Sequence, residues 1–372
     1  MTTETITKEQ LKQSLNIWYQ SMLQQKLETA TNLKEEVANK INNVEEDHDL
    51  LLYYALLNYR YKVLSDWLGI KENSFDHIES FKIPSTGFLA YYYHFLKAIH
   101  FKFLSNYTAA NKHFEKAETL LQYTQNPLEK IEWYYRLGDF YYQSYQQRKA
   151  LDHIKIAKEE FTKHEGYEIN VALCNNLLGL CFIDLKQFEL AEETLYAALD
   201  AFQKEKHEQY VLMVRNNLSL LYTNPALAAP TIPHLSEITK RHILEVTKKN
   251  PLHFKALLIE AQEYYKLGEH TLANESIEKG LTICTELKNK EFQNHFTILR
   301  ELNNKVPASS LETVILKALP YFEKEELWEC VQEYTEILAL KFYEEANHVK
   351  ASQYFHIGNE AKKNSFKKSA LK

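Results

Sequence analysis

The residues of this chain that could do chemistry gather in one acidic stretch, Glu45-Glu46-Asp47-His48-Asp49, directly before a run of leucines. On a helix, consecutive side chains point about 100° apart, so Asp47, His48 and Asp49 cannot close on one metal ion. His48 can still hydrogen-bond a water or a partner through a ring nitrogen. This stretch is therefore a candidate contact site and not a metal site.

Motif searches exclude several classes of enzyme. The sequence contains no H-E-x-x-H, no G-x-x-x-x-G-K-[ST], no G-x-S-x-G and no glycine-rich dinucleotide loop, and its 15 histidines do not fall at metal-ligand spacing. We therefore predict no metal and no cofactor. The four cysteines form no C-x-x-C pair, and Cys174 and Cys181 are seven residues apart on one helical face, so buried thiols are expected.

The composition points to an all-α protein. Only 8 Gly and 8 Pro occur in 372 residues, which disfavours turn-dense β folds and phosphate loops and predicts a chain that rarely turns sharply. No apolar run reaches the roughly 18 residues of a membrane span, and no secretory signal is visible, so we expect a cytoplasmic protein. A formal net charge of −6 argues against binding to nucleic acid. The basic residues near the end, Lys362 to Lys368, are expected to form a frayed, solvated terminus.

The first seventy residues predict a three-helix bundle (1–70). Thr7 and Gln10 have the spacing of a capping box, and the apolar positions of the first helix recur at helical spacing: Leu11, Leu15, Trp18 and Met22. The third helix, which begins near Glu46, is apolar almost all round. Asn73, Ser74, Pro84 and Gly87 mark a flexible linker or hinge over 71–88.

From residue 89 to 372 the sequence repeats itself. The set Ala98, Phe101, Ala110, Phe114 and Ala117 recurs with the same internal spacing as Gly138…Ala157 and then as Gly179…Ala198, with successive offsets of 40 and 41 residues. Sets beginning at Ala261 and Ala339 keep the frame. Small residues where two helices touch, beside an aromatic residue, are typical of tetratricopeptide repeats. Such repeats stack into a superhelix whose concave face can hold an extended peptide.

The acidic stretch and the layout together resemble the Rap family of bacterial regulators, named for response regulator aspartate phosphatase activity. The resemblance rests on Glu45-Glu46-Asp47-His48-Asp49-Leu50-Leu51, the bundle before it and the repeats after it. It implies that the bundle acts on a response regulator or a DNA-binding transcription factor. It also implies that a short secreted and re-imported signalling peptide, bound in the repeats, reverses that action. Some members are antirepressors of transfer genes on mobile elements.

One position departs from the family pattern. Phosphatase members carry Gln where this sequence has His48, and an amide there can orient a water for in-line attack on an aspartyl phosphate. We therefore expect a member that binds without catalysis. The alternative is a phosphatase that uses His48 in place of Gln, and a repeat scaffold without a peptide ligand is a third hypothesis.

The candidate partner-binding residues are Glu46, His48, Leu51 and Tyr59. His48, Leu51, Ala55 and Tyr59 share one helical stripe, which is either a docking face for a partner or a packing face between helices.

The candidate peptide-binding residues lie on the first helices of repeats. The resemblance assigns Asp184 and Asn217 to the peptide, because family members place an Asp and an Asn at such positions; Asn176 is a further polar candidate. An Asn can donate and accept toward a peptide unit, and an Asp can accept backbone N–H groups or pair with a cation. A structural hydrogen bond between repeats is the alternative for Asn217. Self-association through repeat edges is also expected.

Overall fold

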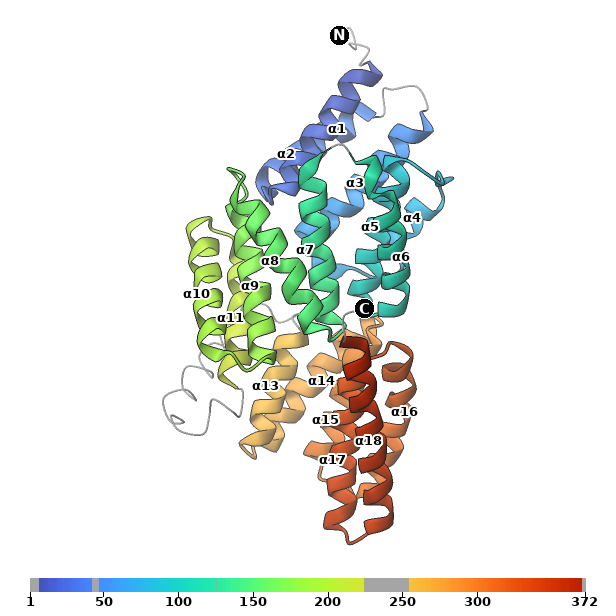
Figure 1. Cartoon of the computed structure of the whole chain (residues 1–372), viewed down its shortest axis with the longest axis vertical. Helices are drawn as coiled ribbons and strands as arrows, with labels where there is room; N and C mark the ends of the chain where they lie inside the picture. Colours follow the sequence, from blue (N-terminus) through green and yellow to red (C-terminus); the bar gives the residue numbers. More distant parts are fainter. Residues whose placement is uncertain (1–6, 42–46, 125, 224–253, 370–372) are drawn as a thin grey trace. The chain divides into compact units, whose positions relative to one another are not determined.

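The computed structural model describes residues 7–41, 47–124, 126–223 and 254–369, and every regular element within these ranges is helical. The chain divides into two compact units, Met1–Leu137 with Ile156–Val171 and Gly138–Lys155 with Ala172–Lys372. The division runs through helices α7, α8 and α9 (Figure 1). The all-α prediction is confirmed.

Three helices open the first unit: α1 (Lys8–Leu23), α2 (Leu27–Ile41) and α3 (His48–Ser65). The capping box is present, because the Gln10 backbone N–H donates to Thr7 Oγ1 (3.2 Å) and the Thr7 N–H donates to Gln10 Oε1 (2.9 Å). The predicted apolar face of α1 is fully buried, with Leu11, Leu15 and Trp18 at 0% exposure. Periodicity alone was enough to find this core.

The predicted linker is folded against the same unit. It contains η2 (Glu72–Phe75) and α4 (Asp76–Glu79), and η1 (Trp67–Gly69) lies just before it. Phe75 is fully buried, and its ring lies 4.8 Å from that of Tyr59 and 5.4 Å from that of His100. The segment therefore contributes an aromatic side chain to the core, while the domain boundaries at 70 and 88 stay a prediction.

Helical hairpins follow, in which the two helices of a pair run antiparallel, as α5 and α6 or α17 and α18 do (Figure 1). Their bounds are α5 (Phe88–Phe103), α6 (Tyr107–Leu120), η3 (Leu121–Tyr123), α7 (Pro127–Gln143), α8 (Gln147–Thr162), α9 (Glu168–Asp184), α10 (Phe188–Lys204), α11 (Glu208–Tyr222), α13 (Phe254–Lys266), α14 (His270–Glu286), α15 (Lys290–Asn303), α16 (Ala308–Lys324), α17 (Trp328–Glu344) and α18 (His348–Ser369).

The repeat frame marks where the helices of a pair touch. A Cβ added to Gly138 would lie 2.6 Å from Ile154 Cγ1, and one added to Gly179 would lie 2.5 Å from Leu195 Cγ. Both distances are too short for a real contact, so only glycine allows this approach. The small residues of the frame therefore bring paired helices into close contact, as the spacing predicted.

The turns differ from expectation, because the chain turns sharply without glycine. Tyr145, Lys186 and Ala346 each take a left-handed φ between two helices (60°, 58° and 58°). In each of these turns a backbone N–H donates a hydrogen bond to the carbonyl of the aromatic residue of the repeat pattern. Gln187 N, for example, donates to Phe182 O (2.8 Å). This bond and the packing of the two helices offset the cost of about 1–2 kcal/mol of the left-handed residue.

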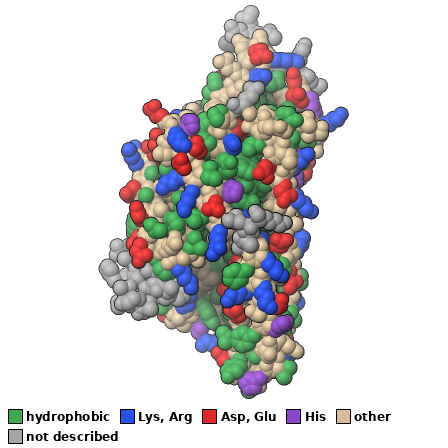
Figure 2. Space-filling model, in the orientation of Figure 1, with side chains coloured by type: hydrophobic (Ala, Val, Ile, Leu, Met, Phe, Trp, Pro, Cys, Tyr) green, Lys and Arg blue, Asp and Glu red, His purple; other side chains and the backbone are tan. Residues whose placement is uncertain are grey.

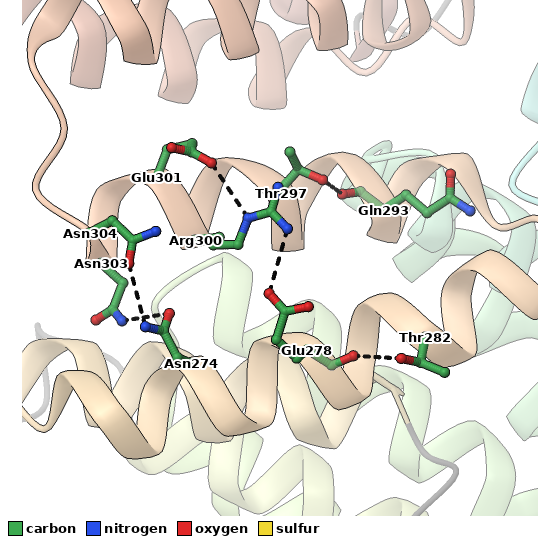
Figure 3. Close-up of polar contacts among 9 residues, drawn as sticks. All are labelled: Asn274, Glu278, Thr282, Gln293, Thr297, Arg300, Glu301, Asn303 and Asn304. Carbon is green, nitrogen blue, oxygen red and sulfur yellow. Dashed lines mark hydrogen bonds and ion pairs between the residues drawn. The ribbon is translucent and has the colours of Figure 1, made fainter.

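Polar contacts join α14 to α15 in the second unit (Figure 3). Asn303 Nδ2 donates to Asn274 Oδ1 (2.9 Å), and Arg300 Nη1 lies 3.5 Å from Glu278 Oε1. In the core of the same helices, Phe296 and Cys284 are fully buried. The pair is thus fixed by an apolar core and by hydrogen bonds at its edge.

The remaining sequence-level expectations concern thiols, membranes and charge. All four cysteines are buried and none is in a disulfide, as predicted. In the described parts of the chain, no helix is both long and apolar enough to cross a membrane. On the face shown in Figure 2, acidic and basic side chains are interspersed.

Candidate functional site

Asp47 starts helix α3 and thereby places His48 at its first position. The Asp47 carboxylate accepts the backbone N–H groups of Asp49 and Leu50 (3.1 Å each) and pairs with Lys8 (3.3 Å). The Leu50 N–H is the largest cause that lowers the pKa of Asp47, with Lys8 also contributing. The acidic stretch is therefore in part a helix cap.

His48 is exposed but engaged by the linker segment. Its Nε2 lies 3.0 Å from the backbone carbonyl of Lys82, and its ring lies 5.7 Å from that of Phe81. A carbonyl oxygen can only accept, so Nε2 carries a proton in this contact, and in the neutral imidazole Nδ1 is then the acceptor. In this arrangement His48 can use Nδ1 toward a partner or a water.

The helical stripe that begins at His48 runs from the surface into the core. Leu51 is half-buried, and Ala55 and Tyr59 are buried. The Tyr59 hydroxyl bonds His100 Nδ1 (3.1 Å). Here Ala55 and Tyr59 are in packing contacts, while His48 and Leu51 reach solvent. Glu46, the remaining candidate for partner binding, lies outside the described residues.

A buried charged cluster, which the sequence did not single out, lies in the first unit. We call Arg60 of α3 with Glu129 and Glu132 of α7 the Arg60 cluster. Arg60 Nη2 bonds Glu132 Oε2 at 2.7 Å, and Arg136 Nε lies 3.4 Å from Glu132 Oε1. Arg60 is 5% exposed and Glu132 is 2% exposed, so this ion pair is almost without water.

Glu129 completes the cluster as an acid without a strong cationic contact. Its Oε1 accepts the Tyr92 hydroxyl (3.1 Å), and its Oε2 makes no hydrogen bond within the described structure. Burial raises the pKa of Glu129 to about 7, and Arg60 offsets only part of that effect. The signal available in the sequence was Arg60, a charge inside the apolar third helix, and two Glu residues three apart on one helical face.

Two of the three candidate peptide-binding residues contact each other. Asn217 Nδ2 on α11 donates to Asn176 Oδ1 on α9 at 2.7 Å, and both side chains are buried. This is the inter-repeat hydrogen bond that the sequence left as the alternative for Asn217. Asn176 Nδ2 faces Met213 Sδ at 4.0 Å. In this conformation the amides join neighbouring repeats.

Asp184 lies eight residues further along α9 than Asn176, about 12 Å along the axis. It is exposed, and its carboxylate accepts one hydrogen bond, from Gln147 Nε2 (3.2 Å). Among the described residues no cation lies within ion-pair distance of it. Partial desolvation raises the pKa of Asp184 to about 6, Gln147 opposes that effect, and repulsion by Glu329 adds to it. We call Asp184 with Gln147 and Glu329 the Asp184 site.

The described residues contain no group of three or more His, Cys, Asp or Glu side chains that could hold a metal ion. The arrangement therefore offers two sites of interest: an imidazole at the start of α3 in the first unit, and an acid without a countercharge at the end of α9 in the second.

Comparison with known proteins agrees with this layout. A sequence profile described as response regulator aspartate phosphatase H, N terminal, matches residues 5–66. Regulatory protein RapF of Bacillus subtilis (strain 168) is 26% identical over 364 residues, covering 95% of this chain and 94% of that protein.

Two solved structures share the fold. A Rap protein complexed with Competence and Sporulation Factor has a TM-score of 0.79 at 20% identity and covers 97% of this chain and 99% of that one. The Rap conjugation gene regulator of plasmid pLS20, in complex with the Phr* peptide, has a TM-score of 0.65 at 17% identity and covers 97% and 98%. The profile at the N-terminal helices and the similarity to RapF along the whole chain confirm the predicted resemblance to the Rap family.

Proposed function

We propose that this chain is a peptide-regulated, non-catalytic inhibitor of a response regulator or a transcription factor. The protein partner contacts Glu46, and it contacts His48 and Leu51 in the first turn of α3, with Tyr59 reached only when the linker moves away. A short signalling peptide binds at the Asp184 site and releases the partner.

The Asp184 site carries the proposal. A carboxylate with a raised pKa, one amide donor and a repelling neighbour is stabilised by an incoming cation. A peptide with a Lys or Arg side chain supplies that charge. The relatives described as complexed with Competence and Sporulation Factor and with Phr* support a peptide ligand.

Asn176 and Asn217 belong to the same proposal. Their mutual hydrogen bond is the peptide-free arrangement, and an extended peptide exchanges it for bonds to its own backbone. Because both amides can donate and accept, the exchange keeps both side chains satisfied.

Calorimetry with a library of synthetic pentapeptides tests this proposal. We expect a cationic member of the library to bind. Its affinity should fall at least about tenfold when its Lys is replaced by norleucine or when Asp184→Asn is introduced into the protein. Asp200→Asn, an exposed acid on α10, is the matched control and keeps wild-type affinity. Equal affinity of Asp184→Asn and wild type would contradict the assignment.

Phosphatase activity is the second candidate function, favoured by the profile match over residues 5–66 and by the acceptor nitrogen of His48. Incubation with phosphorylated response regulators distinguishes the two. Phosphate loss that His48→Ala abolishes and His48→Gln preserves would establish the enzyme and overturn the binding-only proposal. Capture of an unphosphorylated partner, released by peptide, supports the inhibitor. Neighbouring transfer genes would favour an antirepressor role, and the similar protein of plasmid pLS20 is described as a conjugation gene regulator.

A further inference from the structure

Lys368, near the end of the last helix, is not solvated as the basic composition of this segment predicted, although Lys362 and Lys363 are exposed. The side chain of Lys368, in the final turns of α18, is only 15% exposed, whereas Lys367 beside it is exposed. Lys368 Nζ donates to the backbone carbonyls of Glu326 (2.8 Å) and Ser144 (3.2 Å) and lies 3.8 Å from Glu326 Oε2. For Lys368, the expectation of a frayed end is wrong.

The two carbonyls come from turns that are far apart in the sequence but belong to the same compact unit. Ser144 is in the turn between α7 and α8, and Glu326 is in the turn between α16 and α17. Both turns contain a left-handed residue, Tyr145 (φ 60°) and Glu326 itself (φ 55°). Carbonyls at helix ends have no partner within the helix, so they can accept from an ammonium group.

A second contact holds the same helix end next to the Asp184 site. Ser365 Oγ donates to Glu329 Oε1, and Glu329 is the acid that repels Asp184. Cys330, which follows Glu329, is 2% exposed and is hydrogen-bonded by Tyr145. The end of α18, both turns and the Asp184 site thus share one polar neighbourhood.

We propose that Ser365 and Lys368 form a clasp, which closes the second unit beside Asp184 and controls the access of a cationic peptide to that site. Holding a lysine ammonium away from water costs solvation and side-chain freedom, and its three oxygen neighbours offset these costs. Because these costs and contacts nearly balance, the end of α18 can open locally without unfolding of the protein.

Charge explains how a peptide would work against the clasp. Lys368 balances the negative charge of Glu326 and Glu329, and a peptide cation at Asp184 would supply charge to the same surroundings. A bound peptide cation therefore reduces the electrostatic stabilisation that Lys368 contributes, so opening of the clasp is coupled to peptide binding. Control of peptide access rests on the proposed function, whereas the clasp itself rests only on the contacts above.

Cysteine labelling tests the clasp without any ligand. Lys368→Met keeps the aliphatic stem and removes the charge, and Lys367→Met is the matched control. Brief exposure to N-ethylmaleimide followed by mass spectrometry reports each thiol: Cys330 lies beside the clasp, and Cys284 lies in the core of α13–α15. We expect Cys330 to react about fivefold faster in Lys368→Met, with Cys284 unchanged and Lys367→Met like the wild type.

An unchanged Cys330 rate, or a parallel rise at Cys284, would overturn the clasp, because the second result means general loosening. A cationic pentapeptide that binds the wild type is the second probe. In Lys368→Met its association and dissociation should both be several-fold faster, and unchanged rates would overturn the control of access. A library in which no pentapeptide binds the wild type would count against the proposed function and would leave the labelling result intact.

Discussion

Glu132 and Asp184 lie on the first helices of neighbouring repeats, α7 and α9, and their surroundings are opposite. Glu132 is buried and held by Arg60 and Arg136, so its charge is neutralised within the protein. Asp184 reaches solvent, receives one amide hydrogen bond and is repelled by Glu329. A carboxylate thus stabilises the first unit at Glu132, whereas the carboxylate of Asp184 in the second unit still needs a countercharge from a ligand.

This difference separates stability from binding. Truncating one side of the Arg60 cluster leaves a buried charge without a partner, which is costly. Removing the charge of Asp184 takes away a repulsion. Substitutions in the two regions should therefore differ in the size of their effect on folding and in its sign.

The largest effect is expected for Arg60→Met. Glu132 would keep only its longer contact with Arg136, so we expect a loss of about 3–5 kcal/mol in the free energy of unfolding. Urea denaturation followed by circular dichroism measures it. Arg148→Met, an exposed arginine on α8, is the control and should change stability by less than about 0.5 kcal/mol.

A double variant sharpens this prediction. Combining Arg60→Met with Glu132→Gln removes both charges, so it should recover a large part of the loss. If Arg60→Met costs less than about 1 kcal/mol, Arg60 and Glu132 do not interact as a desolvated pair.

Much of the fold could be predicted from the sequence because residues that pack in the core of a helical protein recur at regular spacing. The spacing of Leu11, Leu15 and Trp18 predicted the buried face of α1, and the repeat frame located the helix contacts at Gly138 and Gly179. The motif around His48 led to the resemblance to the Rap family, which the comparisons confirm.

Other features lay outside the reach of the sequence because they depend on contacts between distant residues. A lysine near the end of a chain looks solvated until the turn at Ser144 is known to lie against it. Arg60 looks like a break in an apolar run until Glu132, 72 residues later, is seen to neutralise it. The scarcity of glycine suggested few sharp turns. The structure has them at residues such as Lys186, because packing of the two flanking helices makes a left-handed lysine tolerable, and that packing is not visible in the local sequence.

A second effect, of intermediate size, concerns pH in the first unit. The pKa of Glu129 is raised by burial from about 4.5 to about 7, so its folded form binds a proton that the unfolded form has released. The stabilisation from that proton is complete below about pH 4.5 and is lost as the pH rises through 7. Compared with Glu129→Gln, the wild type should lose on the order of 3 kcal/mol between pH 5 and 8.

Stability curves of the two proteins measured across this range test the prediction. Their difference isolates Glu129 from histidines such as His100, whose pKa burial lowers to about 4 and whose contribution has the opposite sign. Parallel curves would mean that Glu129 is solvated in the folded state.

The smallest effect is expected for Asp184→Asn, and its sign is the sharpest test of the comparison. At pH 7 the Asp184 carboxyl is ionised despite a pKa raised to about 6, so the wild type bears the full cost of the charge. Asn keeps a hydrogen-bonding side chain for Gln147 and removes the repulsion by Glu329. We expect a gain of less than about 1 kcal/mol, because solvent reaches and screens this group.

The gain should shrink as the pH falls below about 6 and should disappear below about 3.8, where the wild-type carboxyl is protonated in the folded and unfolded states alike. Thermal unfolding at pH 7 and pH 4.5, with Asp200→Asn as control, measures the gain and its decrease. A loss of stability in Asp184→Asn at pH 7 would mean that Asp184 already has its countercharge within the protein, as Glu132 has. The second unit would then have no charge left for a ligand to neutralise.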